Sequence, residues 1–131
     1  MKRDMDLVRK ILFKMEENEY EMGIHEGFLP KIDGFSEEQI TYHLEIMGQA
    51  GLLHVQRNEL PQLKDEGMIT QPKFYTSYYS LSWNGHEFLD AARDNTRWEK
   101  VKSAMARVGG FVLPLAMQLL TQLLKAELKL P

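Results

Sequence analysis

Hydrophobic residues recur at three- and four-residue intervals in several segments of the chain, which is the spacing of one helix face. The first such segment predicts a helix that ends near Glu17, with Asp4 or Asp6 available to cap its first turn. Residues 18–35 contain three glycines and a proline, so no long helix is expected there. The apolar face of the first helix consists of Leu7, Val8, Ile11, Leu12 and Met15.

The clearest helix signal lies between residues 36 and 50. Ser36 and Gln39 have the spacing of a capping box, in which each side chain bonds to the backbone N–H of the other residue. Gly51 provides a natural end, because glycine adopts the left-handed conformation that terminates many helices. The predicted buried stripe consists of Ile40, Leu44 and Met47, with His43 beside it.

Two segments rich in aromatic and β-branched residues follow, Leu52–Gln56 and Phe74–Ser82, and both are predicted to be strands. Residues 57–73, with two prolines and a glycine, form a long connection between them. The pattern therefore predicts a β-hairpin directly after the capped helix.

A further helix is expected to start at Asn84 and to run through Met105, until Gly109 and Gly110 interrupt it. The segment Phe111–Leu130 then predicts a last helix, with Pro114 tolerated in its first turn. The predicted fold class is α+β. Residues 1–108 are expected to form a winged-helix-like domain of about three helices and a hairpin wing, and residues 109–131 an additional apolar C-terminal helix.

Length and composition are those of one globular domain: 131 residues, of which 44% are hydrophobic and 27% charged. Absence of cysteine excludes disulfides and thiolate chemistry. The N-terminal residues lack the apolar run of a signal peptide, so a cytoplasmic protein without a membrane span is expected. Net charge is −3, but residues 1–99 hold 11 Lys/Arg against 18 Asp/Glu, and residues 100–131 hold 5 against 1.

Candidate nucleic-acid contacts fall in three places. The 36–50 helix offers polar side chains but no Lys or Arg, and its three glutamates would repel a polyanion. The connection between the strands offers three basic residues, which are offset by acidic ones. Three basic residues at i, i+4 and i+7 share a face of the following helix, where a solvated stripe is the alternative. The candidates are Gln39 and Tyr42, then Arg57, Lys64 and Lys73, then Arg93, Arg97 and Lys100.

The last predicted helix is apolar over a width that exceeds one docking face. It is predicted to form a homodimer contact; packing within the chain and binding to a membrane surface are the alternatives. The dimerisation candidates are Leu113, Met117, Leu120, Leu124 and Leu128.

No catalytic pattern is present in the sequence. The four histidines are far apart, without an HExxH pair, and there is no P-loop, GxGxxG or GxSxG. We therefore expect no enzyme, no catalytic residue, no metal site and no cofactor. His43 is expected beside the core with one nitrogen hydrogen-bonded, and Trp83 and Trp98 are expected to be core anchors.

Two segments resemble parts of bacterial winged-helix repressors. Ile40–Leu53, which ends in alanine-glycine-leucine-leucine, resembles the recognition helix and its continuation into the first wing strand. Tyr79–Leu89 resembles the second wing strand turning into the next helix. The resemblance implies a winged-helix fold. However, residues 22–35, where a positioning helix belongs, hold three glycines and a proline, so that helix is lost or replaced by a strand and turn.

More closely, the whole chain resembles a family of small uncharacterised bacterial and phage proteins classed as a domain of unknown function. Met1–Leu12 and Asn84–Asp90 carry this likeness. It implies a winged-helix-like fold and an origin in a phage or other mobile element, and it brings no catalytic residues.

The functional hypothesis is a non-enzymatic binding module. One version is a winged-helix DNA-binding transcriptional regulator, acting as a homodimer. The alternative is a protein-interaction adaptor whose winged-helix scaffold has lost DNA binding, as the acidic 36–50 helix favours.

Overall fold

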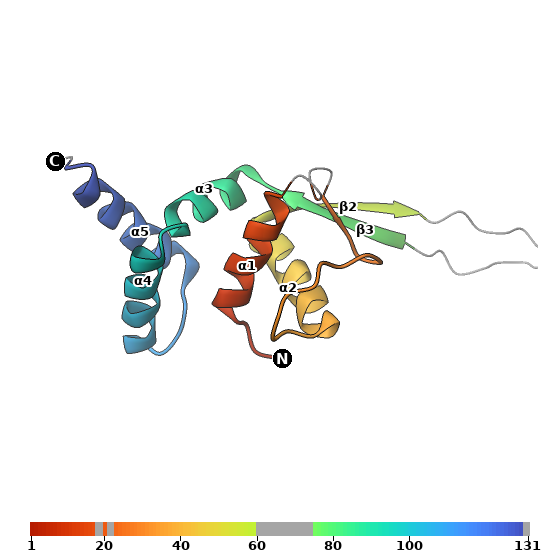
Figure 1. Ribbon diagram of the computed structural model, residues 1–131, viewed down its shortest axis with the longest axis horizontal. Helices are drawn as coiled ribbons and strands as arrows, with labels where there is room; N and C mark the ends of the chain where they lie inside the picture. Colours follow the sequence, from red (N-terminus) through yellow and green to blue (C-terminus); the bar gives the residue numbers. More distant parts are fainter. Residues whose placement is uncertain (18–19, 21–22, 60–74, 130–131) are drawn as a thin grey trace, which may run out of the picture.

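The computed structural model describes residues 1–17, 20, 23–59 and 75–129. Within these residues the protein is α+β, with five helices and a small antiparallel sheet (Figure 1). The elements are α1 (Met5–Met15), β1 (Ile24–His25), α2 (Glu37–Gln49), β2 (Leu53–Glu59), β3 (Tyr75–Leu81), α3 (Trp83–Ala92), α4 (Asn95–Arg107) and α5 (Leu113–Glu127).

The first two helices begin where their capping residues predict. The Asp4 side chain accepts hydrogen bonds from the backbone N–H groups of Asp6 and Leu7 at the start of α1. Ser36 and Gln39 form the predicted capping box at α2, with bonds of 3.2 and 2.8 Å. Both predicted apolar faces are buried, because α1 and α2 pack against each other at the centre of the molecule.

The three strands lie in the order β1-β3-β2. Strands β2 and β3 pair from Leu53 opposite Leu81 to Glu59 opposite Tyr75, and the hairpin projects away from the helices (Figure 1). Strand β2 runs three residues beyond its predicted end. The short β1 pairs Ile24 with Tyr79, and residues 26–36 form turns and extended chain. A strand and turns thus occupy the place of the positioning helix.

The predicted single helix from Asn84 to Met105 is wrong in two respects. It starts earlier, because the Ser82 side chain caps α3 by accepting from the N–H of Gly85 at 3.0 Å. It is also interrupted, because Asp94 caps a new helix, α4, by accepting from the N–H of Arg97 at 2.9 Å.

Arg9 of α1 holds this interruption in place. Its Nε and Nη2 donate to the carbonyls of Ala92 and Arg93 at 2.7 and 2.8 Å, and Nη2 also donates to the Asn95 side chain at 2.7 Å. Carbonyls at a helix end have no partner within the helix, and a guanidinium is a good donor to them. The break between α3 and α4 is therefore stabilised by a residue more than 80 positions away.

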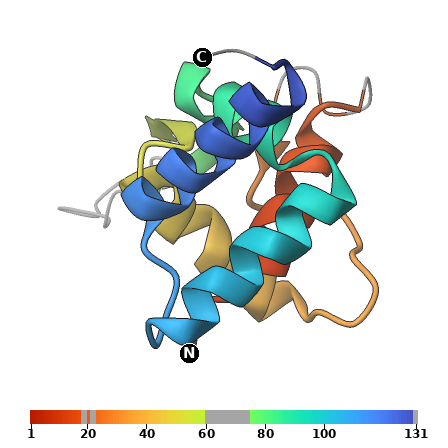
Figure 2. The same cartoon turned by 90° about the vertical axis from the view of Figure 1, so that its left-hand side faces the viewer.

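The last two helices close one side of the core. Helix α4 ends at Arg107, before the two glycines, and α5 begins with Pro114 in its first turn, as predicted. Figure 2 shows α4 and α5 side by side in front of α1 and α3. Trp98, on α4, is buried in the core with its ring edge-on to Phe88 at 6.0 Å between centroids. The prediction for Trp83 is wrong: its side chain is 78% exposed.

Candidate binding pocket

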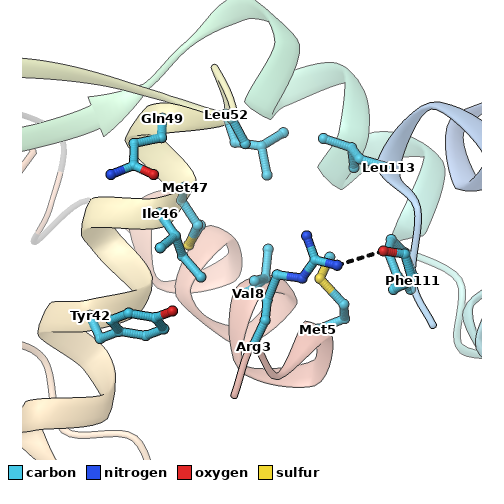
Figure 3. Close-up of a pocket in the computed structure, with 11 residues that line it drawn as sticks. Arg3, Met5, Val8, Tyr42, Ile46, Met47, Gln49, Leu52, Phe111 and Leu113 are labelled. Carbon is cyan, nitrogen blue, oxygen red and sulfur yellow. Dashed lines mark hydrogen bonds between the residues drawn. The ribbon is translucent and has the colours of Figure 1, made fainter. Parts of the chain in front are cut away.

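A pocket of about 500 Å³ lies where the start of α1, one side of α2 and the start of α5 meet. This volume is within the range of small-ligand sites in proteins. Figure 3 shows its lining side chains in place, with α2 on one side and the segment leading into α5 on the other. The described lining residues are Arg3, Met5, Val8, Tyr42, Ile46, Met47, Gln49, Ala50, Leu52, Phe111 and Leu113.

The Arg3 side chain reaches across the pocket to the α5 side. Its Nη2 donates to the backbone carbonyl of Phe111 at 2.6 Å (Figure 3). The next residue along the chain is also fixed, because the N–H of Asp4 donates to Nε2 of His43 at 2.8 Å. A loop carbonyl thus fixes the Arg3 side chain, and a buried histidine of α2 fixes the backbone of the residue that follows it.

His43 is almost fully buried, as predicted, but both of its ring nitrogens are hydrogen-bonded rather than one. A backbone N–H can only donate, so Nε2 must be the acceptor. The proton is therefore on Nδ1, which donates to the Gln39 carbonyl at 2.8 Å. This neutral tautomer links the chain start to the middle of α2.

Hydrogen bonds from α4 to a charged residue also fix the start of α1. Asp6 accepts from the indole of Trp98 at 2.8 Å and from Lys102 at 3.1 Å. Burial raises the pKa of the Asp6 carboxyl, but these hydrogen bonds outweigh it and leave the pKa below its ordinary value. Both acidic residues of the first turn, Asp4 and Asp6, are thus engaged elsewhere.

The pocket is apolar apart from three side chains. Arg3 is the one charged residue among the described lining residues. The Tyr42 hydroxyl points toward the α1 side, where the Arg3 guanidinium lies, and the Gln49 amide lies at the α2 end (Figure 3). Such a site can hold an apolar group and offer two hydrogen-bond donors, from opposite walls, to an acceptor beside that group.

The structure brings only one of the predicted nucleic-acid candidates into this pocket, namely Tyr42. Gln39 lies one turn away, and its side-chain oxygen is occupied by the Ser36 N–H in the capping box. Arg57 is exposed on β2 and is not part of the pocket lining. Lys64 and Lys73 lie outside the described residues.

The predicted basic stripe is divided between two helices. Arg93 follows α3 directly as its C-cap and pairs with Glu16 and Asp90 at 2.7 and 2.9 Å. Arg97 lies in the first turn of α4, pairs with Glu127 at 2.6 Å and has a largely buried side chain. Lys100 is exposed. Two of the three cations are therefore neutralised within the chain, which reduces what they offer to phosphate.

The predicted dimerisation stripe of α5 partly faces the core. Leu120 is fully buried, and three others pack partly against the core. Of the five candidates, the most accessible is Leu128, which is 67% exposed, and Leu113 is part of the pocket wall. Dimerisation through this helix stays a prediction. The stripe consists of Leu113, Met117, Leu120, Leu124 and Leu128.

Sequence reasoning missed Arg3 and the Ile46 side of α2. Arg3 becomes part of a site only through its bond to Phe111, 108 positions later, and no local pattern signals such a contact. Ile46 did carry a signal, since it is an apolar residue outside the buried stripe of its helix.

In the described part of the chain, no helix combines the length and apolar character needed to cross a membrane. No group of three or more His, Cys, Asp or Glu side chains is placed to hold a metal ion in those same residues.

Comparison with known proteins gives a family. A model of the family described as "Hypothetical protein (DUF2513)" matches residues 2–111. The chain belongs to this family. A curated relative in Haemophilus influenzae, described as an uncharacterized protein, is 32% identical over 107 residues, which cover 80% of this chain and 79% of that protein. No solved structure matches the chain. The pocket-lining residues up to Phe111 lie within the family match, and Leu113 lies just beyond it.

Proposed function

We propose that this member of the DUF2513 family is a non-enzymatic protein-binding module, which takes an apolar side chain of a partner protein into the pocket between α1, α2 and α5. The observation that carries this proposal is the composition of the pocket. Eight of its eleven described lining residues are apolar, and the volume they surround is larger than a leucine or phenylalanine side chain needs. Buried apolar anchors in pockets dominate the energy of many protein interfaces.

The scaffold supports a winged-helix interpretation. A helix leads directly into a hairpin, and the short first strand pairs with the second hairpin strand in the order β1-β3-β2. In DNA-binding members of that class, the helix before the hairpin enters the major groove. Here that helix is α2, and its exposed residues include Glu37, Glu38 and Glu45. Its Tyr42 and Ile46 side forms the pocket wall instead.

A substitution on α2 tests the proposal against a matched control. Ile46→Gln places a polar side chain of similar length in the pocket wall, and Thr41→Gln makes a comparable change on the exposed face of the same helix. Proteins captured from cells of the native host are quantified for wild type and both variants, and each candidate partner is then purified. We expect one partner whose Kd rises at least about tenfold with Ile46→Gln and stays unchanged with Thr41→Gln.

The result that would overturn the proposal is equally specific. If every captured protein binds wild type and Ile46→Gln equally well, the pocket is not the interface. Circular dichroism of both variants checks that α2 remains folded, so that a loss of binding reflects the pocket.

DNA binding is the second candidate, and the projecting β2–β3 hairpin is the observation that favours it. A wing of this kind contacts the DNA backbone in winged-helix proteins, and Arg57 is an exposed cation on it. Fluorescence anisotropy of a mixed-sequence duplex, at low and at physiological salt, decides between the candidates. Salt-sensitive binding that weakens with Arg57→Gln would favour DNA. Absence of binding at micromolar protein and low salt would eliminate general DNA affinity.

A further inference from the structure

Besides its apolar surface, the pocket has a positive charge. Its described lining includes one cation, Arg3, and no acidic residue. The nearest acid in the chain, Asp4, has its carboxylate turned into the first turn of α1, where it accepts two backbone N–H groups. Within the described residues, Asp4 therefore forms no ion pair with Arg3.

The donors of Arg3 are only partly used. A guanidinium has five N–H donors, and one of them is bonded to the Phe111 carbonyl. No other hydrogen bond or ion pair joins Arg3 to the described residues, so the remaining donors are available to a ligand. The Phe111 bond fixes the side chain across the pocket, which reduces the entropy that Arg3 loses when it binds.

Tyr42 supplies a donor from the opposite wall. Its hydroxyl points toward the side of the pocket where the Arg3 guanidinium lies (Figure 3), and its ring is held edge-on against His43 at 5.6 Å between centroids. The same His43 fixes the backbone beside Arg3. One buried residue therefore positions both polar walls.

We propose that the pocket is selective for a partner segment in which a carboxylate lies beside an apolar side chain. Arg3 binds the carboxylate, Tyr42 donates a second hydrogen bond, and Val8, Ile46 and Leu52 receive the apolar group. A planar guanidinium binds a carboxylate through parallel N–H···O bonds, which gives direction as well as charge. This inference rests on the proposed function and adds the chemistry of the partner.

Two sources could supply the carboxylate, the C-terminus of a partner chain or an acidic side chain within it. Three short peptides distinguish them: acetyl-Ala-Ala-Leu-Leu with a free carboxylate, the same peptide amidated, and amidated acetyl-Ala-Leu-Glu-Leu. Each is titrated into protein labelled with ¹³C at the methionine methyl groups. Met5 and Met47 line the pocket and report binding, and Met105, buried in α4 outside the pocket lining, is the internal control.

We expect the Met5 and Met47 methyl signals to shift with at least one carboxylate peptide, with a Kd about tenfold lower than for the neutral peptide. Arg3→Gln should remove that preference, and Arg3→Lys should retain part of it, because a lysine keeps the charge but not the fork. Arg107→Gln, at an exposed cation outside the pocket lining, should leave it unchanged. Whichever peptide binds more tightly identifies the source.

Three results would overturn the inference: equal affinity for the charged and neutral peptides, a preference that survives Arg3→Gln, or no shift of Met5 and Met47 with any peptide at millimolar concentration. The proposed function fails separately, when Ile46→Gln leaves binding of the cellular partner unchanged. A partner that is lost with Ile46→Gln but retained with Arg3→Gln would show that the pocket binds protein without selecting a carboxylate.

Discussion

Gly85 in the first turn of α3 lies where a side chain has no room. A Cβ added at this position would be 2.1 Å from the carbonyl oxygen of Leu52 and 3.1 Å from its carbonyl carbon. Neither of these atoms can rotate away, because both belong to the backbone between α2 and β2. The same Leu52 oxygen accepts the N–H of Ser82 at 3.2 Å. The close approach therefore joins the start of α3 to the segment between α2 and β2.

Gly85→Ala should consequently destabilise the protein, although alanine favours helices more than glycine does. An ordinary carbon–oxygen contact is near 3.4 Å, so the two segments would have to separate by roughly 1 Å. Overpacking of this kind destabilises a protein by about 1–3 kcal/mol. The cost at Gly85 should lie in the upper part of that range, because the atoms in contact belong to the backbone and cannot move as a side chain does. Helix propensity returns up to about 1 kcal/mol. The net loss is about 2 kcal/mol, or a fall in Tm of roughly 6–10 °C for a chain of this size.

Urea unfolding followed by circular dichroism measures this loss, provided that the m value is unchanged. Gly110→Ala is the matched control, since a Cβ there meets nothing within 4 Å. It should leave stability unchanged or raise it by up to about 1 kcal/mol. A Gly85→Ala midpoint equal to or above that of wild type would refute the argument from close approach.

Three other predictions follow from the core and from one ion pair. Trp98→Phe removes the indole donor to α1 and leaves a small cavity in the core, so unfolding should become easier by about 1–3 kcal/mol in urea. Leu120→Ala should cost about 2–5 kcal/mol because the side chain is fully buried, whereas Leu128→Ala should change the midpoint little; equal effects would contradict the packing of α5. The hydrogen bond from Arg93 lowers the pKa of Glu16. This pair therefore stabilises the folded protein above the pKa that Glu16 has in the unfolded chain, and the stabilisation is lost as pH falls through the pKa that Glu16 has in the folded protein. Glu16→Gln should therefore lose less stability than wild type between about pH 5 and 3, and parallel pH profiles would exclude this linkage.

The parts of the fold that local chemistry determines could be predicted from the sequence. Ser36 and Gln39 are three residues apart, and their capping box depends on nothing else in the chain. The apolar face of α1 and the end of α4 before Gly109 are local in the same sense. Local reasoning failed where two residues could both cap a helix. Ser82 and Asn84 are both suitable N-cap residues, and Ser82 caps α3.

The remaining errors concern contacts between distant residues. The break after α3 depends on Arg9, which donates to carbonyls 83 and 84 positions away. The exposure of Trp83 depends on the direction in which α3 leaves the hairpin, where its indole bonds to Glu87 at 2.7 Å instead of entering the core. The candidate site has the same character, since Tyr42 alone of its polar residues was predicted, and Arg3 is placed by the fold.

The pocket also has a consequence for the order of events during synthesis. Its walls come from residues 3–8, 42–52 and 111–113, so the first and middle parts leave the ribosome long before the last. Until Phe111 emerges, Arg3 lacks its carbonyl partner and the pocket lacks one wall. A chain that has not yet reached Phe111 therefore has two walls of the pocket and lacks the third. If the proposed function holds, a nascent chain becomes able to bind its partner only after Phe111 has emerged.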